Sequence, residues 1–148
     1  MKKFHIIIWV YIIGFLLNLI WEVLQAPLYE GFDLSSLHLL YCLYASVVDA
    51  FVIAIMFSGF AIYYRRLNWV NKLTIGNAVV LIISGLFVAI IFESWALIRK
   101  QWNYSSNMPI LPFTKIGLSP VLQMMILPFI TFYLTKKISE KKRTNKDL

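Results

Sequence analysis

Three carboxyl groups lie inside apolar stretches of the sequence and are its best candidates for chemistry. Glu22, Asp49 and Glu93 each sit among aliphatic and aromatic residues, whereas the other four acidic residues lie outside such stretches. In lipid, a carboxylate at the centre of a helix costs roughly 2.5 to 3.5 kcal/mol on insertion scales. Acids at such positions relay protons, bind cations or act as general acids and bases, so these three define the candidate site.

The composition indicates the class of protein that positions these acids. The 148 residues are 60% hydrophobic and 14% charged, with a mean hydropathy of +0.74, which no ordinary soluble domain matches. A membrane-spanning helix takes about 20 apolar residues. We therefore predict an all-α polytopic membrane protein with a four-transmembrane-helix domain over residues 1–135 and a basic cytoplasmic tail over 136–148. The predicted spans are approximately 4–24, 37–63, 73–98 and 117–134.

The distribution of lysine and arginine predicts the orientation of the spans. Eleven basic residues lie at the N-terminus, in the second loop and in the tail, against Arg99, Lys100 and Lys115 on the other side. Basic residues concentrate on the cytoplasmic side, so both termini should be cytoplasmic. The net charge of +7 is explained by this topology, and the expected partner of the tail is membrane lipid, not nucleic acid.

The first apolar run has a second interpretation, as a cleaved signal peptide following Lys2 and Lys3. The apolar core of a signal peptide is about 7 to 15 residues long. This run is longer and is followed by Pro27, so we interpret it as a span.

Helical spacing places polar or small residues beside each acid. Asn18, Glu22 and Gln25 stand at i, i+4 and i+7, which is one stripe of a helix. In lipid such stripes turn inward, so the four helices should bring theirs together in the interior. The other stripes are His38, Cys42, Ser46 and Asp49; Gly85, Ala89, Glu93 and Ala96; and Ser119, Gln123 and Thr131.

The acids have a structural and a functional interpretation. As structural groups they would hydrogen-bond across helices and hold the bundle together. Neutral Ser, Thr, Asn and Gln side chains do this without a buried charge, and three acids exceed what it requires. We favour a functional site in which Glu22 and Glu93 form an acid–base pair and Asp49 supports them. The residues expected to bind substrate or position the acids are Asn18, Gln25, Arg99, Trp102, Tyr104 and Gln123.

The loop after the third span combines charged and aromatic residues. Trp102 and Tyr104 fit the aromatic belt at a membrane interface. Alternatively the loop is a lid over the site, with Arg99 or Lys100 paired to Glu22 or Glu93. Proline at 109 and 112 favours extended backbone before each of these positions.

The sequence offers no pattern for a metal or another cofactor. Cys42 is the only cysteine, and neither His5 nor His38 has the spacing of a helical metal site. No glycine-rich phosphate loop is present. We expect no metal and no cofactor.

Four blocks of the sequence resemble a family of small four-span prokaryotic membrane proteins that has no assigned activity. The blocks are NLIWEVLQAPLY, ESWAL followed by WNYSSNMP, and IGLSPVLQ, together with the mid-span Asp49. The resemblance covers most of the chain and implies a prokaryotic cytoplasmic membrane, but no reaction. A fainter similarity is to small polytopic carotenoid cyclases and hydratases. Those cyclases carry paired acids after a helix-opening proline, whereas Pro120 is followed here by VLQ, which argues against cyclisation.

Three functions are compatible with these residues. The first is a membrane enzyme that uses acid–base chemistry on a lipid-like substrate, for example an isoprenoid. The second is a small proton-coupled transporter, which would need a homo-oligomer closely packed through Gly85 and Ala89. The third is a non-catalytic accessory subunit. We favour the first.

Overall fold

Four long helices make up most of the chain in the computed structural model, which describes residues 4–33, 35–72 and 74–144. In these ranges the protein is all-helical and has no strand, and each long helix is long and apolar enough to cross a membrane. The long helices are α1 (Phe4–Gln25), α2 (Ser36–Tyr63), α3 (Ile75–Ile98) and α4 (Leu118–Thr144), and the short 3₁₀ helices are η1 (Ala26–Leu28) and η2 (Trp69–Lys72).

The predicted spans agree with the first three helices to within two residues, and the fourth is longer than predicted. Residues 135–144 continue α4 as helix, so the predicted tail from 136 is not separate from the last helix. Residues 145–148 of that tail, and Lys2 and Lys3, lie outside the described residues.

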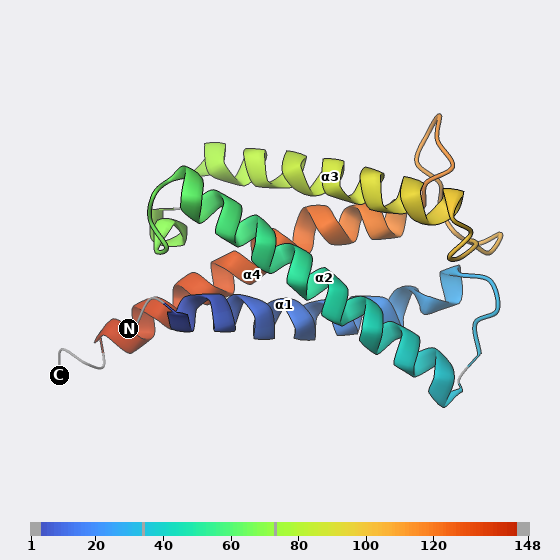
Figure 1. The fold of residues 1–148 in the computed structure, drawn as a ribbon, viewed down its shortest axis with the longest axis horizontal. Coiled ribbons are helices and arrows are strands. Elements are labelled where there is room, and N and C mark those ends of the chain that lie inside the picture. Colours follow the sequence, from blue (N-terminus) through green and yellow to red (C-terminus); the bar gives the residue numbers. More distant parts are fainter. Residues whose placement is uncertain (1–3, 34, 73, 145–148) are drawn as a thin grey trace.

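The helices run alternately up and down between two ends of the molecule (Figure 1). Both described ends of the chain and the connection from α2 to η2 lie at one end, called here the termini end. The α1–α2 connection and the loop between α3 and α4 lie at the other, the loop end. The main packing partners are α1 with α2, α1 with α4, and α3 with α4. The central pair α1 and α4 therefore separates α2 from α3 along much of their length.

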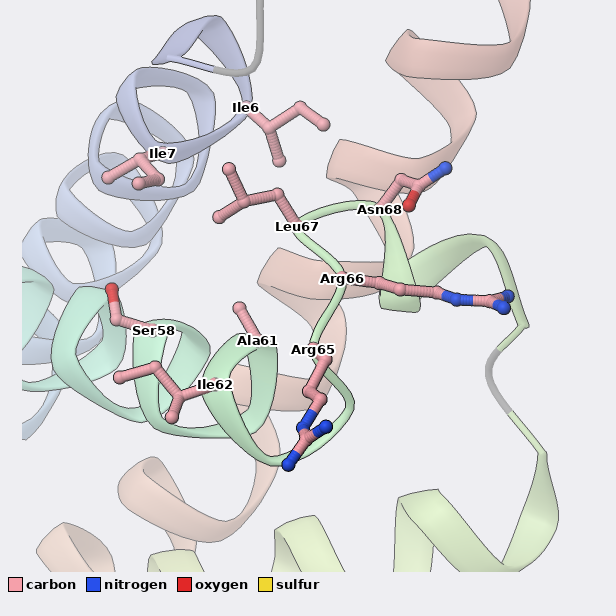
Figure 2. A pocket seen from close by; sticks show the side chains of 9 residues that line it. All are labelled: Ile6, Ile7, Ser58, Ala61, Ile62, Arg65, Arg66, Leu67 and Asn68. Carbon is pink, nitrogen blue, oxygen red and sulfur yellow. The ribbon is translucent and has the colours of Figure 1, made fainter.

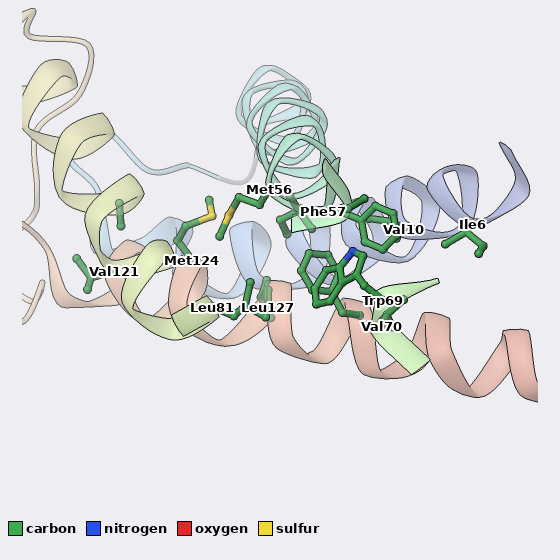
Figure 3. Close-up of a cluster of buried hydrophobic side chains, with 14 of the residues drawn as sticks. Ile6, Val10, Met56, Phe57, Trp69, Val70, Leu81, Val121, Met124 and Leu127 are labelled. Carbon is green, nitrogen blue, oxygen red and sulfur yellow. The ribbon is translucent and has the colours of Figure 1, made fainter. Parts of the chain in front are cut away.

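Toward the termini end the interior is aromatic and aliphatic (Figure 3). Phe57 of α2 is fully buried, with its ring centroid 5.6 Å from that of Trp69 and 5.5 Å from that of Phe132. Phe60 and Tyr64 stack on Trp69. The interior of the termini end is thus packed ring against ring, and at its edge the Tyr64 hydroxyl donates to Asn77 Oδ1 at 2.7 Å.

A glycine allows α3 to pack closely against α4. A Cβ atom added to Gly85 would lie 2.1 Å from the Met124 carbonyl oxygen, so no other residue fits without movement. Pro128 lies four residues after Met124 and has no N–H to donate to that carbonyl. Pro128 therefore removes the usual helical hydrogen bond to the Met124 carbonyl, at the position where Gly85 packs. Near such a proline a helix can bend, and α4 changes direction part-way along its length (Figure 1).

The predicted small-residue stripe of α3 is buried, as Gly85, Ala89, Glu93 and Ala96 all are. Its partner at Gly85 is α4 of the same chain. The stripe is therefore occupied within one molecule and does not offer the homo-oligomer interface suggested for a transporter.

Candidate functional site

A glutamine of α4 links the polar stripes of three helices toward the loop end. The Gln123 amide nitrogen donates to Asn18 Oδ1 at 2.9 Å, to Glu22 Oε1 at 2.8 Å and to Asp49 Oδ2 at 2.9 Å. The side chain is 2% exposed. The predicted convergence of the stripes of α1, α2 and α4 is thus observed, with Gln123 at its centre.

The remaining polar groups complete a connected set. Gln25 donates through Nε2 to Glu22 Oε1 at 2.9 Å and to Gln123 Oε1 at 2.8 Å. Ser119 donates to Gln25 Oε1 at 2.7 Å, and Asn18 donates to the Gly14 carbonyl at 2.7 Å. We call the six side chains the polar network: Asn18, Glu22, Gln25, Asp49, Ser119 and Gln123.

Two carboxyl groups of the polar network contact one another. Glu22 and Asp49 both accept from the Gln123 amide nitrogen, at 2.8 and 2.9 Å, and their side chains interact with each other. Both are partly exposed, whereas Asn18, Gln25 and Gln123 are buried. The neutral amides therefore form the buried part of the polar network, and the two acids, together with Ser119, keep part of their surface exposed.

The third acid, Glu93, is held by the loop that follows α3. It is 7% exposed, and its Oε2 accepts hydrogen bonds from the Tyr104 hydroxyl and, at 3.3 Å, from Trp102 Nε1. Burial and the hydrogen bond to Glu93 raise the pKa of Tyr104 above its usual value. Tyr104 therefore stays a donor at neutral pH, and the loop is tied to the acid through its aromatic residues.

The backbone of this loop docks on the segment after α1. Glu30 donates its N–H to the Asn103 carbonyl at 3.0 Å, and Ser105 donates to the Leu28 carbonyl at 2.9 Å. A Cβ atom on Gly117 would lie 3.0 Å from the Tyr104 ring, so glycine at the start of α4 leaves room for that ring. The loop is therefore docked on the segment after α1, at the loop end of the molecule.

Tyr29 is a site residue that our sequence analysis did not identify. Its ring lies 5.5 Å from that of Tyr104 and 6.3 Å from that of Trp102, between centroids. Burial, followed by the charges of Glu93 and Glu22, raises the pKa of Tyr29 well above its usual value. Tyr29 therefore lies near both acidic groups. Its spacing was the available signal, since it extends the Asn18, Glu22 and Gln25 stripe by four residues.

The predicted ion pair of the loop is not formed. Arg99 and Lys100 are exposed, and in the described part of the chain neither makes an ion pair with Glu22 or Glu93. The reason is local: α3 ends at Ile98, and Arg99 and Lys100 form the helix end, with Lys100 at a positive φ of 53°. Tyr104 and Trp102 supply the contacts that we expected from cations.

His38 of the α2 stripe and Thr131 of the α4 stripe lie outside the polar network. His38 packs edge-on against the Phe32 ring, with centroids 4.9 Å apart. Thr131 is fully buried two turns beyond Gln123, and its hydroxyl has no hydrogen-bond partner among the residues that the structure describes. Of the α2 stripe, Cys42 and Ser46 are buried, and only Asp49 contacts Gln123.

The three acids are surrounded by hydrogen-bonding side chains. Among the described residues, no group of three His, Cys, Asp or Glu side chains is placed to hold a metal. The neighbours of the acids are amides, phenols and an indole, which are hydrogen-bonding groups.

Neither the known protein families, nor the curated proteins, nor the solved structures gave a match to this chain. The function is therefore inferred from the geometry.

Proposed function

We propose that this chain is an integral membrane protein, with both termini cytoplasmic, that performs acid–base chemistry on a lipid-like substrate beside its polar network. The observation that carries the proposal is the Glu22–Asp49 carboxyl pair, which shares the Gln123 amide and retains partial exposure. Two carboxyl groups in contact form a hydrogen bond only when one of them is protonated. The pair thus has a place for one transferable proton.

Counting hydrogen atoms supports the shared proton. The Gln123 amide nitrogen has two hydrogens and three acceptors within 2.9 Å. Two hydrogens cannot serve the three oxygens singly, and a proton between the two carboxyl groups would add a third. Glu22 already accepts from Gln25 and Gln123, while Gln123 is the one donor to Asp49 among the described residues. We therefore assign the proton to Asp49, which donates it to the carboxylate of Glu22.

Glu93 provides the second half of the chemistry. In the proposed reaction the pair gives its proton to the substrate, and the Glu93 carboxylate takes a proton from another position of that substrate. The total charge of the three acids is unchanged. Glu93 then releases its proton and the pair takes one up, which restores the starting state. Protonation by the pair would leave the substrate as a cation until Glu93 removes a proton. Aromatic faces stabilise such a cation, and the rings beside it would be those of Trp102, Tyr104 and Tyr29. An apolar environment with a few converging polar groups suits an isoprenoid or acyl chain.

Hydrogen exchange tests the proposal without knowledge of the product. The full chain in liposomes containing a polyisoprenoid test lipid would be incubated in D₂O, and deuterium in the lipid would be measured by mass spectrometry. Enzyme-dependent incorporation is expected to be lost in Asp49→Asn and Glu93→Gln. The matched control Glu30→Gln, an exposed loop acid, should exchange like the wild type. Equal incorporation in all four proteins would rule out the acids as the catalytic groups.

A further inference from the structure

The termini end contains a cavity that the proposed chemistry does not use. Its volume is about 640 Å³, within the range of roughly 300 to 1,000 Å³ typical of small-molecule sites. It lies between the start of α1, the end of α2 and the connection to η2, at the opposite end from the polar network (Figures 1 and 2). Its lining residues are Ile6, Ile7, Ser58, Ala61, Ile62, Arg65, Arg66, Leu67 and Asn68.

The lining combines an aliphatic wall with two arginines. In Figure 2 the Leu67 side chain points from the connection after α2 toward Ile6 and Ile7 of α1, and those of Arg65 and Arg66 extend outward from this connection in different directions. In the described part of the chain, neither arginine makes an ion pair. The cavity thus has an apolar part that suits hydrocarbon and, at its edge, two positive charges that form no ion pair within the described residues.

We propose that this cavity binds an anionic phospholipid, with its phosphate at Arg65 and Arg66 and part of an acyl chain against Ile6, Ile7 and Leu67. Guanidinium groups match phosphate oxygens in geometry and charge. The inference rests on the membrane insertion and orientation proposed above, which place the termini end at the anionic cytoplasmic leaflet. It is independent of the chemistry proposed for the acids.

The chain offers a matched control at its other end. Arg65 and Lys100 both follow a helix at a positive φ of 53°, and each has a basic neighbour, Arg66 or Arg99. Their helix ends share one hydrogen-bond pattern, in which Arg66 N–H donates to the Ala61 carbonyl and Gln101 N–H to the Ala96 carbonyl. The two pairs therefore carry equal charge on similar backbone, and Arg99 and Lys100 are not part of this cavity.

The test measures the lipid retained by the purified full chain from micelles holding equal amounts of phosphatidylglycerol and phosphatidylcholine, by native mass spectrometry. The wild type should retain phosphatidylglycerol preferentially. The double variant Arg65→Gln/Arg66→Gln should bind it about thirtyfold more weakly, since each basic residue near a membrane surface contributes to anionic lipid binding. The control Arg99→Gln/Lys100→Gln and the site variant Glu22→Gln should retain it like the wild type.

A second variant separates the cavity from surface charge. Ser58→Leu adds a larger side chain to the cavity wall and leaves both arginines in place. It should weaken phosphatidylglycerol retention, whereas general attraction to charge would be unaffected. Equal losses in both double variants, no loss at Arg65 and Arg66, or full displacement of the lipid by inorganic phosphate would each overturn the proposal. A wild-type protein that retains the lipid but exchanges no hydrogen would overturn the proposed chemistry and still support this inference.

Discussion

The two ends of the same four helices are held together by different interactions, aromatic packing at the termini end and hydrogen bonds between polar side chains toward the loop end. Near the termini end, Phe57, Trp69 and Phe132 pack ring against ring in a core without side-chain hydrogen bonds between them. Toward the loop end, Gln123 links Glu22 and Asp49 through hydrogen bonds in the same helix bundle. The difference indicates that the aromatic end holds the helices in register, so that the polar end can keep acids in an otherwise costly environment.

If this division is correct, the largest stability loss should come from the aromatic end. Phe57→Ala removes a fully buried ring that contacts Trp69 and Phe132, and the expected loss is about 3 to 5 kcal/mol of unfolding free energy. Titration of the helical circular dichroism in mixed micelles with a denaturing detergent measures this loss. The matched control Phe51→Ala, on the same helix but 61% exposed, should change stability far less. Similar losses for the two would break the comparison.

The contact between α3 and α4 should give the next largest effect. Gly85→Ala places a Cβ atom 2.1 Å from the Met124 carbonyl oxygen, and the forced separation should cost about 1 to 3 kcal/mol. The same detergent titration measures it. Gly59→Ala serves as the control, because a Cβ atom there has no neighbour within 4 Å. A Gly85→Ala protein as stable as the wild type would show that the two helices are not held this closely.

The loop over the site should give the smallest effect and a distinct pH dependence. Tyr104→Phe removes one hydrogen bond to Glu93 and should cost about 1 kcal/mol. Burial and the bond to Glu93 raise the pKa of Tyr104 in the folded protein. Its stabilisation is therefore fully present below the unfolded pKa of about 10 and is lost as pH rises toward the folded value.

The measurement for Tyr104 is stability between pH 7 and 11, in the wild type and in Tyr104→Phe. The wild type should lose more stability above pH 10 than the variant does. Tyr133→Phe removes an exposed tyrosine and should retain the wild-type dependence. Parallel curves for wild type and Tyr104→Phe would contradict the assigned role of the hydroxyl.

The number of helices and the inward direction of the polar stripes could be predicted from the sequence, because both follow from short-range patterns. Apolar length locates a span, and the spacing of Asn18, Glu22 and Gln25 places them on one face. The apolar length of the last run did not predict that the charged residues after 135 continue α4 as helix to Thr144.

The pairing of side chains could not be predicted, because it depends on which helices are neighbours. Arg99 was expected to pair with an acid on charge alone, yet the geometry of the helix end leaves it exposed and Tyr104 takes its place. The α3–α4 contact is determined by the absence of a side chain at Gly85, and apolar periodicity carries no information about it. Tyr29 belongs to the site only because the loop from 99 to 117 folds back on it.

The central claim is that Glu22 and Asp49 share one proton, and infrared spectroscopy of the full chain in bilayers at pH 7 tests it most directly. The wild type should show the C=O stretching band of one protonated carboxyl. In either Glu22→Gln or Asp49→Asn this band should disappear, because the remaining acid is then a carboxylate held by the neighbouring amides. If each variant removed only part of the band, or if the wild type had no such band, the two acids would titrate separately and the account would be wrong.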